Sequence, residues 1–209
     1  MKNLIIIGAR GFGRAVAWWA KSCRGHGSEF RLKGFLDDNA AALDGYDIAL
    51  PILGSPQTYA IEKDDVFVCA LGEPKWKKHY VEMIAARGGE FISLVHEMAF
   101  VGERVQVGKG CIFLAGIVLA ADIRLGNFVT LQPYSSIGHD SVVGDYVHMN
   151  THGFVGGYAV LGEGATIHAG GKVLPQKKVG DWGVVGAGAV VLRDVKAHTT
   201  VAGVPATEL

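Results

Sequence analysis

The stretch Ile137-Gly-His-Asp-Ser-Val-Val143-Gly-Asp-Tyr-Val-His-Met149 decides the fold, because an apolar residue recurs in it at every sixth position. The same spacing runs from Val101 to Val191 through sixteen consecutive hexads without an insertion. The residue after the apolar anchor is glycine in nine of these hexads, and the fourth residue after the anchor is usually small or β-branched. A period of six fits neither an α-helix nor a simple alternating strand.

Such a period is typical of a parallel β-helix, in which three hexads form one triangular coil. We expect each anchor to fill the core, and each glycine or small residue to let the chain turn a corner. Sixteen hexads predict about five coils, a stack roughly 25 Å tall at the usual spacing between strands. A β-sandwich, the alternative, would show a period of two and irregular turns.

The first 96 residues follow a different pattern, in which strand-like and helix-like segments alternate. Strands are predicted at 2–7, 33–38, 65–71 and 91–95, and helices at 14–23 and 75–87. The sequence therefore predicts a small Rossmann-like parallel α/β domain over residues 1–96. The β-helix domain and its C-terminal tail would occupy residues 97–209.

Composition narrows the possible partners. Among the 209 residues, Lys plus Arg and Asp plus Glu each number 20, so no basic surface for nucleic acid or an anionic membrane is expected. Three cysteines without CxxC spacing favour a reducing compartment and no zinc site. The apolar start is too short for a signal peptide, and no run is long enough for a membrane span. We expect a cytoplasmic protein.

The hexads and the closing Val201-Ala-Gly-Val-Pro-Ala206 resemble those of the hexapeptide-repeat acyltransferases, which implies a left-handed helix. The opening Ile6-Ile-Gly-Ala-x-Gly-x-Gly13, the Phe35-Leu-Asp-Asp38 segment and Ser136-Ile-Gly-His-Asp140 are similar to motifs of one group in particular. That group contains sialic acid O-acetyltransferases and the bacillosamine and perosamine N-acetyltransferases. The resemblance covers nearly the whole chain and implies acetyl-CoA as the acyl donor.

Acyl transfer from a thioester requires a base that removes a proton from the attacking amine or hydroxyl. His139 stands at the third position of its hexad, outside the core, and is the predicted base. The resemblance implies that Asp140 orients its imidazole; the alternative is a solvated turn histidine. One coil later the chain has Gly157 at the position stacked on His139, and we expect this glycine to leave room beside the imidazole for a thin ligand; the alternative is that Gly157 only serves the turn.

His148 follows His139 by half a coil, so the two side chains should lie on opposite sides of one prism. They can share a site only if a neighbouring subunit supplies one of them, which predicts a cyclic homotrimer with sites between subunits. The resemblance implies that His148 contacts acetyl-CoA there; the alternative is an ordinary surface histidine.

A column of small residues at one corner predicts a shallow groove. The resemblance implies acetyl-CoA contacts at Ala169 and Ala187 in this column, although small residues also suit corners for purely structural reasons. His152 and His168 suggest a zinc site, but His168 stacks on Asn150 and no ligand column forms. No metal is expected.

In the first domain, Gly8-Ala-Arg-Gly-Phe-Gly13 follows a strand and opens a helix, where free N–H groups favour a phosphate. The spacing GxxGxG makes an NAD site a weak interpretation. Asp37 and Asp38 end the next predicted strand, where carboxylates bind ribose or base groups. The resemblance implies a nucleotide-sugar pocket lined by residues of these three segments: Arg10, Gly11, Phe12, Asp37, Asp38 and Gly72. Some relatives carry histidine at the position of Phe12, whose ring cannot form that hydrogen bond.

These features together predict an acetyl-CoA-dependent N-acetyltransferase that acts on a nucleotide-linked amino sugar, with His139 as general base. A sugar O-acetyltransferase and a non-catalytic β-helix binding protein are the alternatives. The sequence does not identify the acceptor sugar, the nucleotide or the pathway; the resemblance implies surface polysaccharide or glycan assembly.

Overall fold

Two compact units, Met1–Glu97 and Met98–Leu209, make up the computed structural model, which describes residues 1–209. The first is a parallel α/β unit and the second is a parallel β-solenoid, so the predicted combination of folds is confirmed at that level. The longest helix has only 12 residues, and neither helix has the length and hydropathy of a membrane span.

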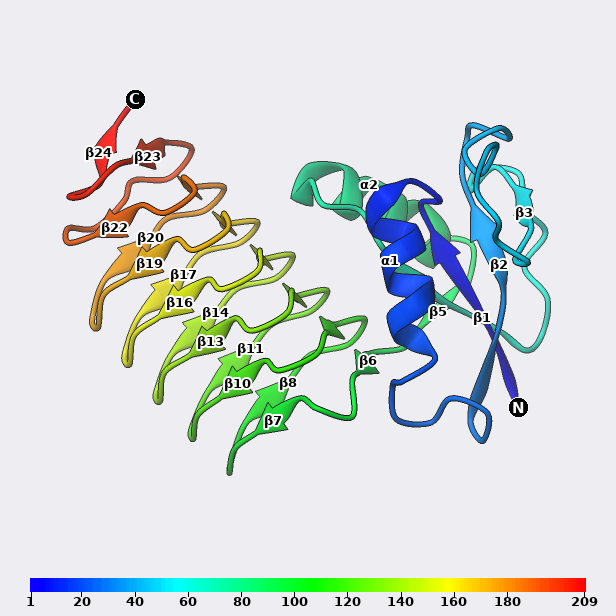
Figure 1. Ribbon diagram of the computed structural model, residues 1–209, viewed down its shortest axis with the longest axis horizontal. Coiled ribbons are helices and arrows are strands. Elements are labelled where there is room, and N and C mark those ends of the chain that lie inside the picture. The colour runs from blue at the N-terminus through cyan, green and yellow to red at the C-terminus, as the bar shows by residue number, and fades with distance from the viewer. The chain divides into compact units, whose positions relative to one another are not determined.

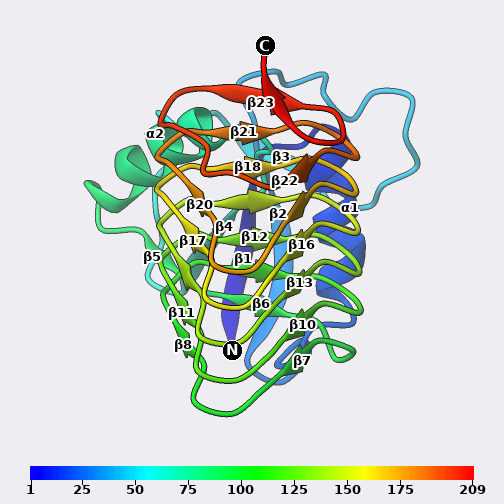
Figure 2. The same ribbon diagram turned by 90° about the vertical axis from the view of Figure 1, so that its left-hand side faces the viewer.

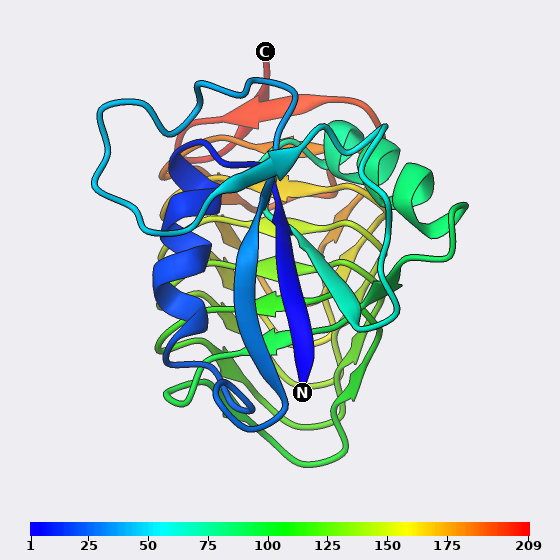
Figure 3. The same ribbon diagram turned by 90° about the vertical axis from the view of Figure 1, so that its right-hand side faces the viewer.

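Five parallel strands form the sheet of the first unit, in the order β3-β2-β1-β4-β5 (Figure 3). The strands of this unit are β1 (Lys2–Ile7), β2 (Phe30–Leu36), β3 (Ile52–Gly54), β4 (Asp65–Cys69), β5 (Glu90–Phe91) and the short β6 (Leu94–Val95). Two helices, α1 (Gly11–Ala20) and α2 (Pro74–Ala85), follow β1 and β4. Because β1 lies between β2 and β4, the connections diverge there, and a ligand crevice is expected at the carboxyl ends of these strands.

The central strands β1 and β4 are almost entirely buried, which explains their continuous apolar sequences. The exception is the buried Asp65 at the start of β4, whose carboxylate accepts hydrogen bonds from Lys33 Nζ and Tyr59 Oη, each at 2.8 Å. Burial alone would raise the pKa of Asp65, but these hydrogen bonds outweigh it and lower the pKa. β3 was not predicted, because its three residues are too few to show a period.

The solenoid has three sheets, one for each side of the triangular coil (Figures 1 and 2), and their strands are parallel except for β24. The first sheet consists of β7 (Phe100–Val101), β10 (Val118–Leu119), β13 (Ser136–Ile137), β16 (Phe154–Val155), β19 (Lys172–Val173) and β22 (Val190–Val191). The second consists of β8 (Gln106–Val107), β11 (Arg124–Leu125), β14 (Val142–Val143), β17 (Val160–Leu161) and β20 (Lys178–Val179). The third contains β9 (Ile112–Phe113), β12 (Thr130–Leu131), β15 (His148–Met149), β18 (Thr166–Ile167), β21 (Val184–Val185), β23 (Thr200–Ala202) and β24 (Thr207–Glu208).

The register shows why the hexads predicted too few coils. Strands of neighbouring coils pair at a spacing of eighteen residues, as Leu119 does with Ile137. The sixteen anchors account for the six strands of the first sheet and the five of the second, but the third sheet continues beyond the last anchor with β23 and β24. The last coil is two residues shorter, because Val195 bridges to Val179 and Val201 pairs with Val185. A search for a period of six misses this coil, because sixteen is not a multiple of six.

The glycines that follow the anchors do not turn the corners, contrary to the prediction. Left-handed backbone occurs two residues later in every hexad but the last, usually at non-glycine residues such as Asp140 and Tyr158, with φ near +60°. The glycines instead allow coils to approach. A Cβ on Gly138 would lie 2.5 Å from the backbone nitrogen of Gly157 in the next coil, and one on Gly144 would lie 2.8 Å from that of Glu163. Close stacking of backbone on backbone therefore requires glycine there.

The C-terminal segment closes the stack. β24 pairs antiparallel with β23, joining Val201 to Glu208 and Ala202 to Thr207. The N–H of Ala206 also donates to the carbonyl of Val190 at 2.8 Å. The outer edge of the last coil is therefore covered along part of its length by the chain itself.

Candidate functional site

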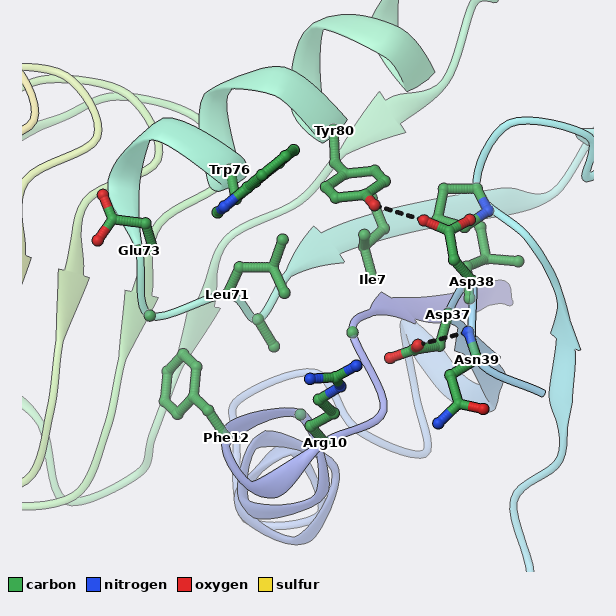
Figure 4. Close-up of a pocket in the computed structure, with 16 residues that line it drawn as sticks. Ile7, Arg10, Phe12, Asp37, Asp38, Asn39, Leu71, Glu73, Trp76 and Tyr80 are labelled. Carbon is green, nitrogen blue, oxygen red and sulfur yellow. Dashed lines mark hydrogen bonds between the residues drawn. The ribbon is translucent and has the colours of Figure 1, made fainter. Parts of the chain in front are cut away.

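A pocket of about 590 Å³ opens in the first unit at the carboxyl ends of β1, β2 and β4 (Figure 4). Its walls come from the turn before α1, the segment after β2, the segment after β4 and the first turns of α2. Five of the six predicted substrate residues line it: Arg10, Phe12, Asp37, Asp38 and Gly72. Gly11 does not line the pocket.

The glycine-rich turn brings α1 against the end of β1. Gly8 has a φ of +96°, which an L-residue adopts only with strain. A Cβ on Gly13 would lie 1.9 Å from the carbonyl oxygen of Gly8, so only glycine allows the helix to begin this close to the strand. α1 starts at Gly11, earlier than predicted, and its N-cap residue Arg10 provides no side-chain cap. The first N–H groups of an α-helix have no acceptor within the helix, and the side chain of Arg10 supplies none.

The two carboxylates after β2 are held in place by hydrogen bonds from the protein. Asp37 accepts from the N–H of Ala9 at 2.8 Å and from the N–H of Asn39 at 2.9 Å. Asp38 accepts from the hydroxyls of Ser55 and Tyr80, each at 2.5 Å. The bonds from Ser55 and then Tyr80 lower the pKa of Asp38. The hydrogen bond from Tyr80 to Asp38, together with burial, raises the pKa of Tyr80 to about 12, so its hydroxyl stays protonated and acts as the donor.

Sequence reasoning missed several residues of the pocket, chiefly those on or beside α2. Glu73, Trp76 and Tyr80 line it, as does Asn39 after β2. The signal was available, because Trp76 and Tyr80 are four residues apart and so lie on one face of a helix. That helix follows the carboxyl end of a strand beside β1, where the crevice of a parallel sheet lies.

In the solenoid, His139 and Asp140 stand at a corner just after β13. The imidazole Nδ1 lies 2.8 Å from Asp140 Oδ2, and both side chains are exposed to solvent. Because the carboxylate accepts from Nδ1–H, the neutral ring has its lone pair on Nε2, which is the atom that can accept a proton. The ring of Tyr158 packs edge-on against the imidazole, at 5.2 Å between centroids.

Gly157 lies against His139, although for a different reason from the predicted one. A Cβ on Gly157 would lie 2.9 Å from both Cε1 and Nε2 of the imidazole. The missing side chain therefore makes room for the imidazole itself, rather than for a ligand beside it. Gly157 fixes the position of the ring, together with Asp140 and Tyr158.

An ion pair stands one coil before His139 at the same corner. Arg104 donates to both oxygens of Asp122, with Nε–Oδ1 at 2.6 Å and Nη2–Oδ2 at 2.8 Å. The hydrogen bond from Arg104 lowers the pKa of Asp122. Two carboxylates, Asp122 and Asp140, thus stand near the imidazole, and Arg104 neutralises the more distant one.

His148 lies on β15, in a different sheet from the strand that precedes His139. Its side chain is buried, and its Nε2 lies 3.0 Å from the amide nitrogen of Gln132. Gln132 also donates to Asn150 Oδ1 at 2.8 Å, and Asn150 Nδ2 lies 3.4 Å from His168 Nδ1. Within one chain, the structure does not bring His139 and His148 together.

Ala169 and Ala187 are exposed at a corner where little side-chain volume stands. A Cβ added to the neighbouring Gly188 would meet no atom within 4 Å, and one on Gly170 would meet only Gly188 at 4.0 Å. The corner is therefore a shallow ledge. No group of three His, Cys, Asp or Glu side chains is placed to hold a metal ion.

Comparison with known proteins adds to this geometry. Residues 3–84 match the family model of the PglD N-terminal domain. A UDP-N-acetylbacillosamine N-acetyltransferase from Bacillus subtilis is 30% identical over 117 residues, which are 55% of this chain and 52% of that protein. The chain thus matches about half the length of this curated relative. The resemblance inferred from the motifs is confirmed.

Two solved structures match the chain over its whole length. The acetyltransferase domain of PglB from Neisseria gonorrhoeae, in complex with acetyl coenzyme A, is 28% identical, with a TM-score of 0.88 over 100% of this chain and 99% of that one. PerB from Caulobacter crescentus, in complex with CoA and GDP-perosamine, is 24% identical, with a TM-score of 0.89 over 100% and 98%. The second match is a likeness of fold alone.

Proposed function

We propose that this protein is an acetyl-CoA-dependent N-acetyltransferase that acts on a nucleotide-linked amino sugar. The observation that carries the proposal is the His139–Asp140 pair, an exposed imidazole whose Nε2 is free to accept a proton. The PglB domain binds acetyl coenzyme A, and the Bacillus relative is an N-acetyltransferase of a UDP-linked sugar. Both relatives support the same class of reaction for this chain.

The pocket of the first unit would bind the nucleotide. Arg10 lines it, and its guanidinium can bind a diphosphate together with the N–H group of Gly11 at the start of α1. Asp37 and Asp38 would accept hydrogen bonds from the ribose or the base. Gly72, at the end of β4, keeps the pocket wall free of a side chain.

His139 would act as the general base. As the amine nitrogen attacks the thioester carbonyl carbon, its proton passes to Nε2, and Asp140 stabilises the imidazolium through Nδ1–H. The C–N bond forms, the C–S bond breaks, and the thiolate of CoA receives the proton from the imidazolium. The products are an amide and free CoA.

A thin cosubstrate fits the ledge at Ala169 and Ala187, because a methyl group is the largest side chain on it. This ledge, together with His148, is our proposed acetyl-CoA site. A single chain keeps His139 and His148 apart, so we propose a homotrimer of left-handed solenoids in which neighbouring subunits complete each site. Light scattering that finds a monomer at micromolar concentration would contradict the shared site.

The decisive experiment is a screen of UDP-, GDP- and dTDP-linked amino sugars with acetyl-CoA, in which the release of free thiol is followed. Thiol release with one of them, and a product 42 mass units heavier, is the expected result (acetyl for hydrogen). A product that survives mild alkali is an amide, whereas a labile one is an ester and would favour the sugar O-acetyltransferase. A protein that shows no thermal shift with acetyl-CoA or CoA would instead be a binding protein without this activity.

A further inference from the structure

The pocket of the first unit has two chemically different ends (Figure 4). Asp37, Asp38 and Asn39 gather at one end. Phe12 and Glu73 lie at the other end, and Arg10 lies between the two groups. A nucleotide sugar has the same linear order, with a nucleoside, a charged diphosphate and then a pyranose. With the diphosphate at Arg10 and the nucleoside at the aspartates, the pyranose would lie near Phe12 and Glu73.

Trp76 provides an apolar surface over this part of the pocket. Trp76 is 58% exposed, so its indole is accessible to a ligand in the pocket. Its ring contacts His79 edge-on at 5.8 Å and Tyr80 at 6.4 Å, both on its own helix, and these neighbours fix its orientation. An indole held in place beside a pocket can pack against the C–H face of a pyranose, or attract a cation to its π-face.

Glu73 is the carboxylate of this end. It is the N-cap residue of α2, and its Oε1 accepts from the N–H of Lys75 at 3.5 Å, which is long for a hydrogen bond. The remaining lone pairs of the carboxylate face solvent or the pocket, because the residue is exposed and also lines the pocket. By contrast, each oxygen of Asp38 already accepts a short hydrogen bond from a hydroxyl of the protein.

We propose that Trp76 and Glu73 form the subsite for the acceptor sugar and favour a sugar that carries a protonated amine over one that carries a hydroxyl. The inference rests on the proposed function, and it specifies the acceptor within that function. An ammonium gives Glu73 a charge-assisted hydrogen bond and gives Trp76 a cation–π contact, whereas a hydroxyl gives neither. Glu73 and Trp76 are thus specificity residues that act before the chemical step. The bound ammonium loses one proton to solvent, and the neutral amine then attacks with His139 as the base.

The test measures equilibrium binding of UDP, UDP-glucose and three UDP-linked hexoses that carry one amine, at carbon 2, 3 or 4. We expect the wild type to bind at least one amino sugar about tenfold more tightly than UDP-glucose, as one charge-assisted hydrogen bond allows. Glu73→Gln should remove this preference without changing the affinity for UDP. Trp76→Ala should weaken all four UDP-sugars and leave UDP unchanged. Glu82→Gln, an exposed carboxylate elsewhere on α2, should behave like the wild type.

Each other outcome has a distinct meaning. An amine preference that survives in Glu73→Gln, or an affinity for UDP that falls as much as that for UDP-sugars in Trp76→Ala, would overturn the subsite but not the proposed function. If UDP does not bind, the same measurements are made with GDP and dTDP and their sugars. A wild type that binds none of the three nucleotides would overturn the proposed function, and the subsite with it.

Discussion

The solenoid and the α/β unit position their functional groups by different physical means. In the solenoid, the residues around His139 are one coil apart, so that Gly157 and Tyr158 contact the imidazole because the register stacks eighteen residues on eighteen. In the α/β unit, Asp38 is held by Ser55 and Tyr80, which come from unrelated positions in the chain. The repeat thus positions the groups around His139. The pocket of the α/β unit is instead positioned by the connections that diverge on either side of β1.

In a repeat fold such as the solenoid, the positions of the side chains can be predicted from the period of the sequence. In the α/β unit, the lining of the pocket cannot be predicted in this way. From Arg104 to Gly188 the corners of the solenoid repeat the same backbone, with a left-handed residue at every sixth position. The pocket depends instead on where loops of unequal length end. The two units should therefore respond differently to substitution.

The substitution with the largest expected effect should lower the rate of acetyl transfer without changing the affinity for the nucleotide. His139→Ala should reduce turnover by roughly 10²–10⁴-fold, because it removes the general base. The affinity for the nucleotide should not change, since the pocket residues belong to the other unit. Steady-state thiol release and nucleotide titration measure the two quantities. His198→Ala, another exposed histidine in the solenoid, is the matched control. Near-normal turnover of His139→Ala would sink the assignment of the base.

A second substitution tests the close contact between α1 and β1 beside the pocket of the α/β unit. Gly13→Ala places a methyl group 1.9 Å from the carbonyl oxygen of Gly8, and such overpacking costs about 1–3 kcal/mol of unfolding free energy. Gly11→Ala is a sharp control, because the added Cβ meets no atom within 4 Å. Thermal unfolding and nucleotide binding should be impaired only in the first variant. Equal behaviour of the two variants would contradict the tight contact between α1 and β1.

A third substitution tests the stacking of coils at the corner that carries His139. In Gly157→Ala the new methyl group lies 2.9 Å from the His139 ring. The imidazole must move to avoid this contact, and a displacement of about 1 Å lowers turnover by roughly 10- to 100-fold. The KM for both substrates should change less than kcat. A variant with wild-type kcat would show that the position of the imidazole does not depend on this glycine.

The smallest effect is a pH dependence in the α/β unit. Hydrogen bonds from Ser55 and Tyr80 lower the pKa of Asp38 below its unfolded value. Their stabilisation is therefore fully present above the unfolded pKa, near 3.9, and is lost as the pH falls through the lower folded value. Asp38→Asn should reduce stability at neutral pH, and the difference from wild type should shrink below about pH 4. Urea unfolding at several pH values measures it, and a difference that grows on acidification would contradict the predicted sign.

The sequence predicted most of the solenoid because its core anchors recur with one period. Ile137 and Val155 pair in the register that the hexads require, and His139 and Asp140 meet as predicted. The hexads failed at Val195, where the period itself changes. They also misassigned the glycines, because a repeated glycine can mean either a turn or a close approach, and only coordinates distinguish the two.

Prediction was poorer for the pocket. The motif residues Arg10, Asp37 and Asp38 were found because a glycine-rich turn and a strand end have local signatures. Trp76 and Tyr80 were missed because their place in the pocket depends on how α2 follows β4 in three dimensions. Their spacing of four residues places them on one face of a helix, but it does not say that this face meets the pocket.

The antiparallel strand β24 has a consequence for the growth of the molecule. A stack of parallel coils ends in an open row of N–H and C=O groups, which can accept another strand and lead to end-to-end fibres. Here Thr207–Glu208 turns back on β23, and the segment before it bonds to β22. An antiparallel strand cannot be followed by another parallel coil in the same register. The chain thereby limits its own polymerisation at this end, much as a terminal cap does in other repeat proteins.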